Sequence, residues 1–211
     1  MTQTEGHKGK LMKDKIIIVL DTETLGIKNR QVYEIGYVVA TADGKVLRER
    51  DYMIKQTYEN IALFNTAYYA NKRSIYEQKL ADGLAKSVYW GYAMKVLASD
   101  IARYGVSELY AYNSAFDISA IELTHKRLGA KTRPTADGII DIMDFIGSIT
   151  DTNEYMEFCV ANGYMTKANK PQTKAETLFR YITNNNDFIE DHMALEDSRI
   201  ELDILMRALA C

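Results

Sequence analysis

The sequence predicts an α/β fold in which helices flank a mixed five-stranded sheet. Residues 16–20 read Ile-Ile-Ile-Val-Leu, an apolar run typical of a strand that is buried on both faces of a sheet. Asp43-Gly44 is a hairpin turn signal, so the segments on either side should pair as antiparallel strands. Strand and helix patterns then alternate toward the C-terminus, and this order is typical of layered α/β folds.

Glycines and capping patterns set the expected ends of the elements. The strands are expected at residues 16–20, 31–41, 45–56, 108–113 and 138–146. A helical pattern rich in Ala, Leu, Tyr and Met runs from about 61 to 104 and closes at Gly105, and a second helix ends at Gly129. Thr173 and Glu176 match a capping box that opens a third helix. The last helix is expected over roughly residues 194–210.

The composition indicates one soluble domain, which we expect at residues 13–211 after a flexible tail at residues 1–12. A chain of 211 residues can bury one substantial core. Its two cysteines, Cys159 and Cys211, have no disulfide or metal-ligand spacing, which fits a cytoplasmic protein. No apolar run has the length of a signal peptide or a membrane span, so no membrane partner is expected. A net charge of −3 argues against binding nucleic acid by overall basicity, but it allows a local groove with a metal site.

Two acids, Asp21 and Glu23, follow directly after the apolar run. Residues i and i+2 of an extended chain point to the same side, so their carboxylates should lie together at the end of a buried strand. Like charges placed side by side destabilise each other unless a positive charge joins them. A divalent metal and a solvated turn both explain the pair.

Asn113 and Asp117 follow the strand predicted at residues 108–113. Asp117 falls in the first turn of the next helix, where the helix dipole favours an acid without any ligand role. Asn113 stands where an amide can orient a neighbouring carboxylate or a substrate phosphate, and it is equally a turn residue. Both interpretations stay open for both residues.

Asp197 lies on the apolar face of the last predicted helix. Ile200, Ile204 and Ala208 recur at helical spacing, and Asp197 precedes Ile200 by three residues. A carboxylate that faces the core destabilises the fold unless a charge partner or a metal meets it. The other acids nearby are expected to be mostly solvated, namely Glu190, Asp191, Glu196, Glu201 and Asp203.

His192 precedes Asp197 by five residues and is the one histidine near these acids. An unperturbed imidazole has a pKa near 6.5, so a histidine at this position can exchange protons around neutral pH. A structural role is the alternative.

Three motifs in order resemble those of the DnaQ-like 3′–5′ exonucleases of the DEDDh type. They are "LDTETLG" at the first strand, "YNSAFD" after a later strand, and "HMALED" at the last helix. The resemblance extends from Ile16 to about Leu209 and implies a ribonuclease H-like fold. This sequence differs from the family at Tyr112, where members often have a histidine. The segment at residues 56–80 is also longer than in minimal members. Residues 165–182 are similar to phage-encoded members.

The resemblance implies that Asp21, Glu23, Asp117 and Asp197 hold two Mg²⁺ (or Mn²⁺) ions, with His192 as general base. It further implies hydrolysis of single-stranded DNA or short oligonucleotides from the 3′ end, with release of 5′-mononucleotides. The terminal nucleotide would contact the backbone at Thr24 and Leu25, with Leu25 or Phe116 packed on its base, and Asn113 is a further expected contact. A position in the core is the equal alternative for Phe116. A DNA polymerase or another replication protein is a partner that the resemblance allows.

Three alternatives remain beside this interpretation. An RNA-directed 3′–5′ exoribonuclease or oligoribonuclease would use the same residues, because a contact to the 2′-hydroxyl depends on loop geometry. A catalytically silent module that binds 3′ ends or a polymerase would keep the fold, although all five expected catalytic residues are present. A structural metal site or a surface charge network would explain the acids without catalysis.

Overall fold

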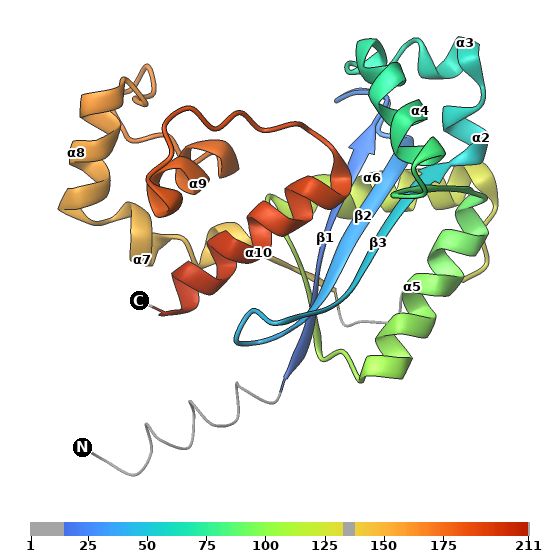
Figure 1. The fold of residues 1–211 in the computed structure, drawn as a ribbon, viewed down its shortest axis with the longest axis horizontal. Helices are drawn as coiled ribbons and strands as arrows, with labels where there is room; N and C mark the ends of the chain where they lie inside the picture. The colour runs from blue at the N-terminus through green and yellow to red at the C-terminus, as the bar shows by residue number, and fades with distance from the viewer. Residues whose placement is uncertain (1–14, 133–137, 211) are drawn as a thin grey trace.

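A six-stranded mixed sheet forms the centre of the molecule (Figure 1). The computed structural model describes residues 15–132 and 138–210. The strands are β1 (Ile16–Thr24), β2 (Val32–Thr41), β3 (Val46–Ile54), β4 (Lys86–Val88), β5 (Glu108–Ala111) and β6 (Ile139–Asp141). They lie in the order β4-β3-β2-β1-β5-β6. The predicted tail, residues 1–12, and Cys211 lie outside the described residues.

The pairing of the strands is mixed, as the sequence predicts. Strand β2 is antiparallel to both β1 and β3, whereas β1 with β5, β5 with β6, and β3 with β4 are parallel. Asp43-Gly44 turns the chain between β2 and β3, and Gly44 has a φ of 87°. The predicted hairpin is therefore confirmed.

Helices cover both faces of the sheet. They are α2 (Lys55–Tyr58), α3 (Ile61–Phe64), η1 (Ala70–Lys72), α4 (Arg73–Ala81), α5 (Trp90–Tyr104), α6 (Ser114–Leu128), η2 (Ile142–Asp144), α7 (Gly147–Thr150), α8 (Asn153–Asn162), α9 (Ala175–Thr183) and α10 (Ala194–Ala210). No helix in the described ranges combines the length and the apolar character needed to cross a bilayer.

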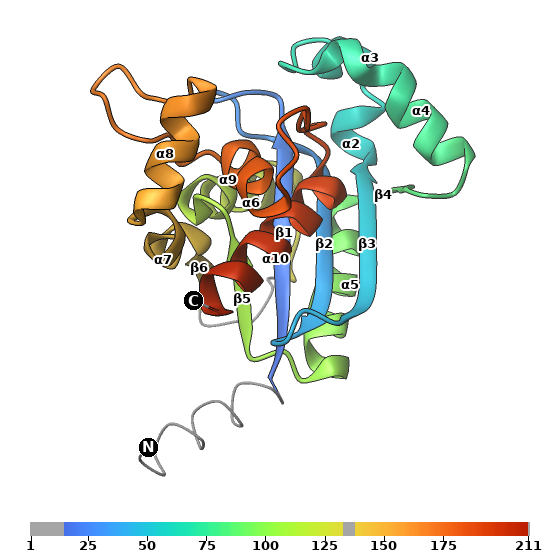
Figure 2. The ribbon, with the colours of Figure 1, turned by 60° about the vertical axis from the view of Figure 1, so that its left-hand side comes forward.

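Side chains of β1 point alternately into two hydrophobic cores, one on each face of the sheet. Ile17 and Val19 pack with α7–α10 on one face, while Ile18 and Leu20 pack with α5 and α6 on the other. In Figure 2, α10 crosses in front of the sheet and α5 lies behind it. Because β1 is buried on both faces, its apolar run is continuous. A third cluster packs α2–α4 against the ends of β2 and β3.

The structure differs from the sequence prediction between residues 61 and 104, where a helical pattern was expected and no strand. The chain there forms α3, η1 and α4, then the edge strand β4, and only then α5. The sheet therefore has six strands where five were expected. Gly83 ends this first helical part with a φ of 73°, which favours glycine. Strand β4 has three residues, too few to produce an alternating pattern.

Two smaller expectations are also corrected. The strand predicted at 138–146 stops at Asp141, because the Asp141 carboxylate accepts the N–H of Met143 and starts a turn of 3₁₀ helix. The capping box does not form, since helix α9 begins after Lys174 without a side-chain cap. The carbonyl of Thr173 instead accepts the Tyr112 hydroxyl, and Glu176 binds Arg180.

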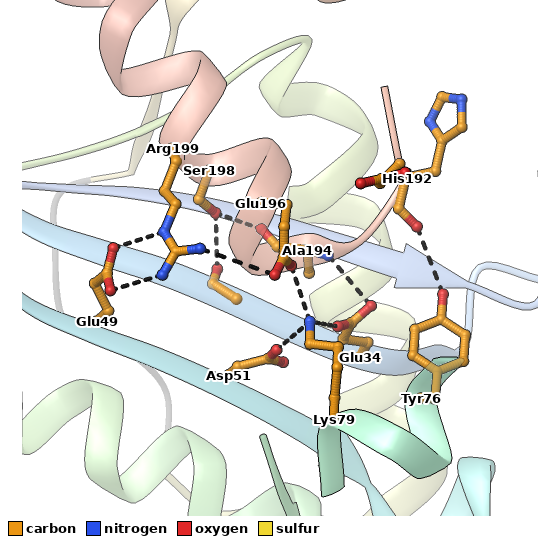
Figure 3. Close-up of polar contacts among 12 residues, drawn as sticks. Glu34, Glu49, Asp51, Tyr76, Lys79, His192, Ala194, Glu196, Ser198 and Arg199 are labelled. Atoms are coloured by element: carbon orange, nitrogen blue, oxygen red, sulfur yellow. Dashed lines mark hydrogen bonds and ion pairs between the residues drawn. The ribbon is translucent and has the colours of Figure 1, made fainter. Parts of the chain in front are cut away.

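Helix α10 begins in direct contact with strand β2. A Cβ atom added to Gly36 would lie 2.1 Å from the backbone nitrogen of Leu195. The Ser198 hydroxyl donates to the Gly36 carbonyl at 3.2 Å, and a Glu34 carboxylate oxygen accepts the N–H of Ala194 at 3.2 Å (Figure 3). Together these contacts fix where the first turn of α10 lies on the sheet.

We predict that Gly36→Ala destabilises the fold, because the added methyl group meets backbone that cannot rotate away. The expected loss in the free energy of unfolding is about 3 kcal/mol. Urea denaturation measures it. Gly91→Ala is the matched control, because a Cβ at Gly91 in helix α5 meets nothing within 4 Å. Equal stability of the two variants would contradict the close approach.

Candidate functional site

A cleft of about 900 Å³ opens where β1 ends, and it is lined by nearly all of the predicted site residues. Its lining includes Asp21, Glu23, Thr24, Asn113, Phe116, Asp117, His192 and Asp197. Leu25 is the exception, because its side chain is buried in the cluster around Tyr33 and Met53. The cleft joins the end of β1 to the starts of α6 and α10, segments far apart in the sequence.

Strand β1 carries the first two carboxylates. Oxygen Oδ2 of Asp21 is buried and has no hydrogen-bond partner. Burial, with the charges of Asp117 and Glu201, raises the pKa of Asp21 well above its usual value. Burial also raises the pKa of Glu23 to about 8. The Tyr33 hydroxyl donates to Glu23 at 3.4 Å, so one Glu23 oxygen has a fixed position.

Helix α6 carries the third carboxylate, Asp117, which is buried. The Thr22 hydroxyl donates to Asp117 Oδ1 at 2.7 Å, and burial raises the pKa of Asp117 to about 7. Asp141 fixes the start of this helix, because its carboxylate accepts the N–H groups of Asn113 and Ser114 at 2.9 and 3.1 Å. Neither Thr22 nor Asp141 was expected at the site from the sequence. Asn113 itself has a φ of 57°, and its exposed side chain makes no cap.

Asp197 and His192 complete the set from the other side of the cleft. Asp197 is buried in the first turn of α10, and its Oδ1 has no hydrogen-bond partner. Burial, followed by the charges of Glu190 and Glu23, raises the pKa of Asp197 to about 9. Glu23, His192 and Asp197 each offer a ligand atom, and these atoms lie within 4.8 Å of one another. The core-facing carboxylate expected from the helical spacing is thus present.

Glu201 is a further buried acid of the cleft. The prediction that it is solvated was wrong. It lies one helical turn after Asp197, is 5% exposed, and accepts the Tyr112 N–H at 3.3 Å. Burial and the charges of Asp117 and Asp197 raise the pKa of Glu201 well above its usual value. Glu190 also lines the cleft, and burial raises its pKa to about 7. The i, i+4 spacing from Asp197 was the signal for Glu201.

These carboxylates fit a divalent cation. Asp21 and Asp197 each hold a buried oxygen without a partner. Within residues 15–132 and 138–210, no Lys or Arg side chain forms an ion pair with Asp21, Glu23, Asp117 or Asp197. Oxygen donors suit Mg²⁺ or Mn²⁺, and the cleft offers them without thiolates.

The remaining expected contacts lie around this centre. Thr24 is buried at the end of β1, and Phe116 is partly buried with the Arg30 guanidinium 4.8 Å from its ring centroid. Tyr112 stands where the DnaQ-like family often has a histidine, and its N–H and hydroxyl are engaged by Glu201 and Thr173. It therefore joins α10 to the loop before α9.

The arrangement of the sheet and helices matches solved structures. This is the fold of exonuclease I. Exonuclease I from Methylocaldum szegediense superimposes with a TM-score of 0.53 over 92% of this chain and 40% of its own. An exonuclease I bound to the inhibitor BCBP gives 0.55 over 92% and 41%. The E. coli exonuclease I complex with a dA16 oligonucleotide gives 0.50 over 90% and 39%.

The sequence identity to each of these three exonuclease I structures is 14%, so the likeness establishes the fold. This chain spans about two fifths of their length. No family model and no curated protein matches the sequence. The ribonuclease H-like fold implied by the three motifs is confirmed.

We predict that the metal-free protein loses stability as pH rises from about 5 to 8. Glu23, Asp117 and Asp197 have raised pKa values when folded, whereas unfolded carboxyl groups titrate near pH 4. The folded state therefore binds more protons in this range, and the free energy of unfolding falls as they dissociate. Urea denaturation in EDTA at several pH values measures the slope.

The same experiment compares a cleft variant with a control variant. Asp197→Asn should flatten the slope, whereas Glu122→Gln should leave it unchanged, because Glu122 is exposed and does not line the cleft. Mg²⁺ should restore stability at pH 8 by binding the folded state. A stability that rises with pH in EDTA would contradict the raised pKa values that burial gives these carboxylates.

Proposed function

We propose that this protein is a metal-dependent 3′–5′ exonuclease that hydrolyses single-stranded DNA or short oligonucleotides and releases 5′-mononucleotides. The observation that carries the proposal is the cleft where four expected acids, two of them with unpartnered buried oxygens, meet His192. The fold shared with exonuclease I supports it, because one such structure holds a dA16 oligonucleotide.

The proposed ligands are Asp21, Glu23, Asp117 and Asp197, and two Mg²⁺ or Mn²⁺ ions are the proposed cofactors. When bound, these ions offset the charge that builds on the phosphate and stabilise the leaving 3′ oxygen. Thr22 and Tyr33 hold the Asp117 and Glu23 carboxylates by hydrogen bonds at 2.7 and 3.4 Å. Fixed ligands bind a cation with less loss of side-chain freedom.

His192 is the proposed general base. Burial, with the nearby Lys72 ammonium, lowers the pKa of His192 below 6.5, so the imidazole is neutral at pH 7 and has a free lone pair. A neutral imidazole can take the proton of an attacking water. The proposed substrate contacts are the backbone at Thr24 and the ring of Phe116, both on the cleft.

The first assay follows 5′-labelled single-stranded DNA and RNA of one sequence with Mg²⁺, with Mn²⁺ and with EDTA. We expect a ladder that shortens from the 3′ end, depends on metal, and is faster on DNA. A faster RNA reaction would favour the exoribonuclease alternative. Intact strands whose 3′ ends remain bound would contradict hydrolysis and favour the silent binding module.

We predict that Asp21→Asn lowers the rate more than about 100-fold, which exceeds the usual effect of residues that only support metal ligands. Asp203→Asn is the matched control, because Asp203 is an exposed acid on α10. Calorimetric titration with Mn²⁺ should show weaker binding to Asp21→Asn alone. Wild-type activity in Asp21→Asn would contradict the metal assignment.

His192→Gln should lower kcat by about 10²- to 10⁴-fold while Mn²⁺ still binds, because a general base contributes a factor of this size. The pH–rate profile provides the second readout. At saturating Mn²⁺, which keeps the carboxylates deprotonated, the acidic limb of the wild-type profile should vanish in His192→Gln. A profile that keeps this limb would remove His192 as the base.

A further inference from the structure

We propose that Tyr69 and Tyr76, in the segment at residues 56–80, position His192 for proton transfer. The inference rests on the proposed function of His192 and assigns a role to part of the segment that is longer than in minimal DnaQ-like members. The two tyrosines act on different parts of the histidine, one on its ring and one on its backbone.

Tyr69 sets the plane of the imidazole. The rings of Tyr69 and His192 are stacked, with centroids 4.8 Å apart and planes 15° apart. Lys72 holds the tyrosine in turn, because its ammonium lies 4.4 Å from the Tyr69 ring centroid. The Glu190 carboxylate lies 3.7 Å from Nδ1, which is too long to orient the ring by itself.

Tyr76 holds the backbone of His192. This residue has a φ of 47°, a left-handed conformation that a non-glycine residue seldom adopts without external contacts. The Tyr76 hydroxyl donates to the His192 carbonyl at 3.5 Å (Figure 3). It also lies 3.0 Å from the Tyr33 hydroxyl. The Tyr33 hydroxyl in turn lies 3.4 Å from Glu23, so close contacts between two hydroxyls connect the histidine backbone with a proposed metal ligand, although their two protons cannot make all three hydrogen bonds at once.

The same segment anchors the chain on both sides of His192. The Lys72 ammonium donates to the Asp191 carbonyl just before it. The Lys79 ammonium is buried beside Glu34, at 3.4 Å, and Glu34 accepts the Ala194 N–H just after it. Figure 3 shows Lys79 between the Glu34, Asp51 and Glu196 carboxylates. The Glu34 carboxyl, with Lys79 beside it, holds the start of α10 through this N–H.

Tyr69 also lines the cleft, so a direct contact with the substrate is the competing explanation. A substrate contact would act on binding whether or not His192 is present. A positioning residue acts only through the histidine. A double-mutant cycle separates the two.

The first experiment compares Tyr69→Leu with Tyr69→Phe, which keeps the stacked ring. We expect Tyr69→Leu to lower kcat about 10-fold with KM unchanged, the size typical of residues that orient a reacting group. Tyr69→Phe should retain the wild-type rate. In the His192→Gln background, Tyr69→Leu should cause no further loss. A loss that persists in that background, or one confined to KM, would overturn the assignment.

The second experiment compares two hydroxyl deletions in one aromatic cluster. Tyr76→Phe removes the contacts to His192 and Tyr33, whereas Tyr58→Phe removes a buried hydroxyl that has no hydrogen-bond partner. Only Tyr76→Phe should lower kcat and change the pH–rate profile. Equal effects of the two variants would reduce Tyr76 to a packing role and overturn its part of the proposal.

A third readout does not need activity. In proton NMR, the stacked Tyr69 ring should shift the His192 imidazole resonances upfield, with His192→Gln identifying the signals. Tyr69→Phe should keep this shift and Tyr69→Leu should abolish it. The shift would support the stacking even in a protein without exonuclease activity, where the proposed function alone would fail. Wild-type resonances that Tyr69→Leu leaves unchanged would overturn the stacking.

Discussion

The close contact between helix α10 and strand β2 determines the geometry of the candidate site. Helix α10 carries Asp197 and Glu201, and the turn before it carries His192. The helix can lie this near the sheet because residue 36 has no side chain, and Glu34 accepts the first N–H of the helix. A helix displaced by one methyl group would move these three functional groups relative to Asp21 and Glu23 on β1.

Two groups of buried carboxylates lie near this contact, and they differ in how their charge is offset. Glu34, Asp51 and Glu196 surround the Lys79 ammonium, which offsets part of their charge, although burial still raises the pKa values of Glu34 and Asp51. The carboxylates of the cleft have no such ion pair among the described residues, and their pKa values are raised. The first group stabilises the frame of the site, and the second is suited to an external cation.

The sequence located most of the fold and of the candidate site. The buried strand β1, the hairpin at Asp43-Gly44 and helix α10 follow patterns that lie within one segment, where periodicity and turn chemistry are sufficient. Strand β4 and the missing cap at Thr173 could not be predicted in this way. A strand of three residues has no period, and the Thr173 carbonyl is engaged by Tyr112 from a distant part of the chain.

What the sequence determined by itself was the set of acids and their order, because the i, i+2 and i, i+3 spacings of Asp21, Glu23 and Asp197 follow from local geometry. Only the tertiary structure decided which further groups join them. Glu201 becomes a cleft residue through the burial of α10, and Tyr69 reaches His192 across more than a hundred positions of sequence. Contacts of this kind depend on packing between elements, which no local pattern encodes.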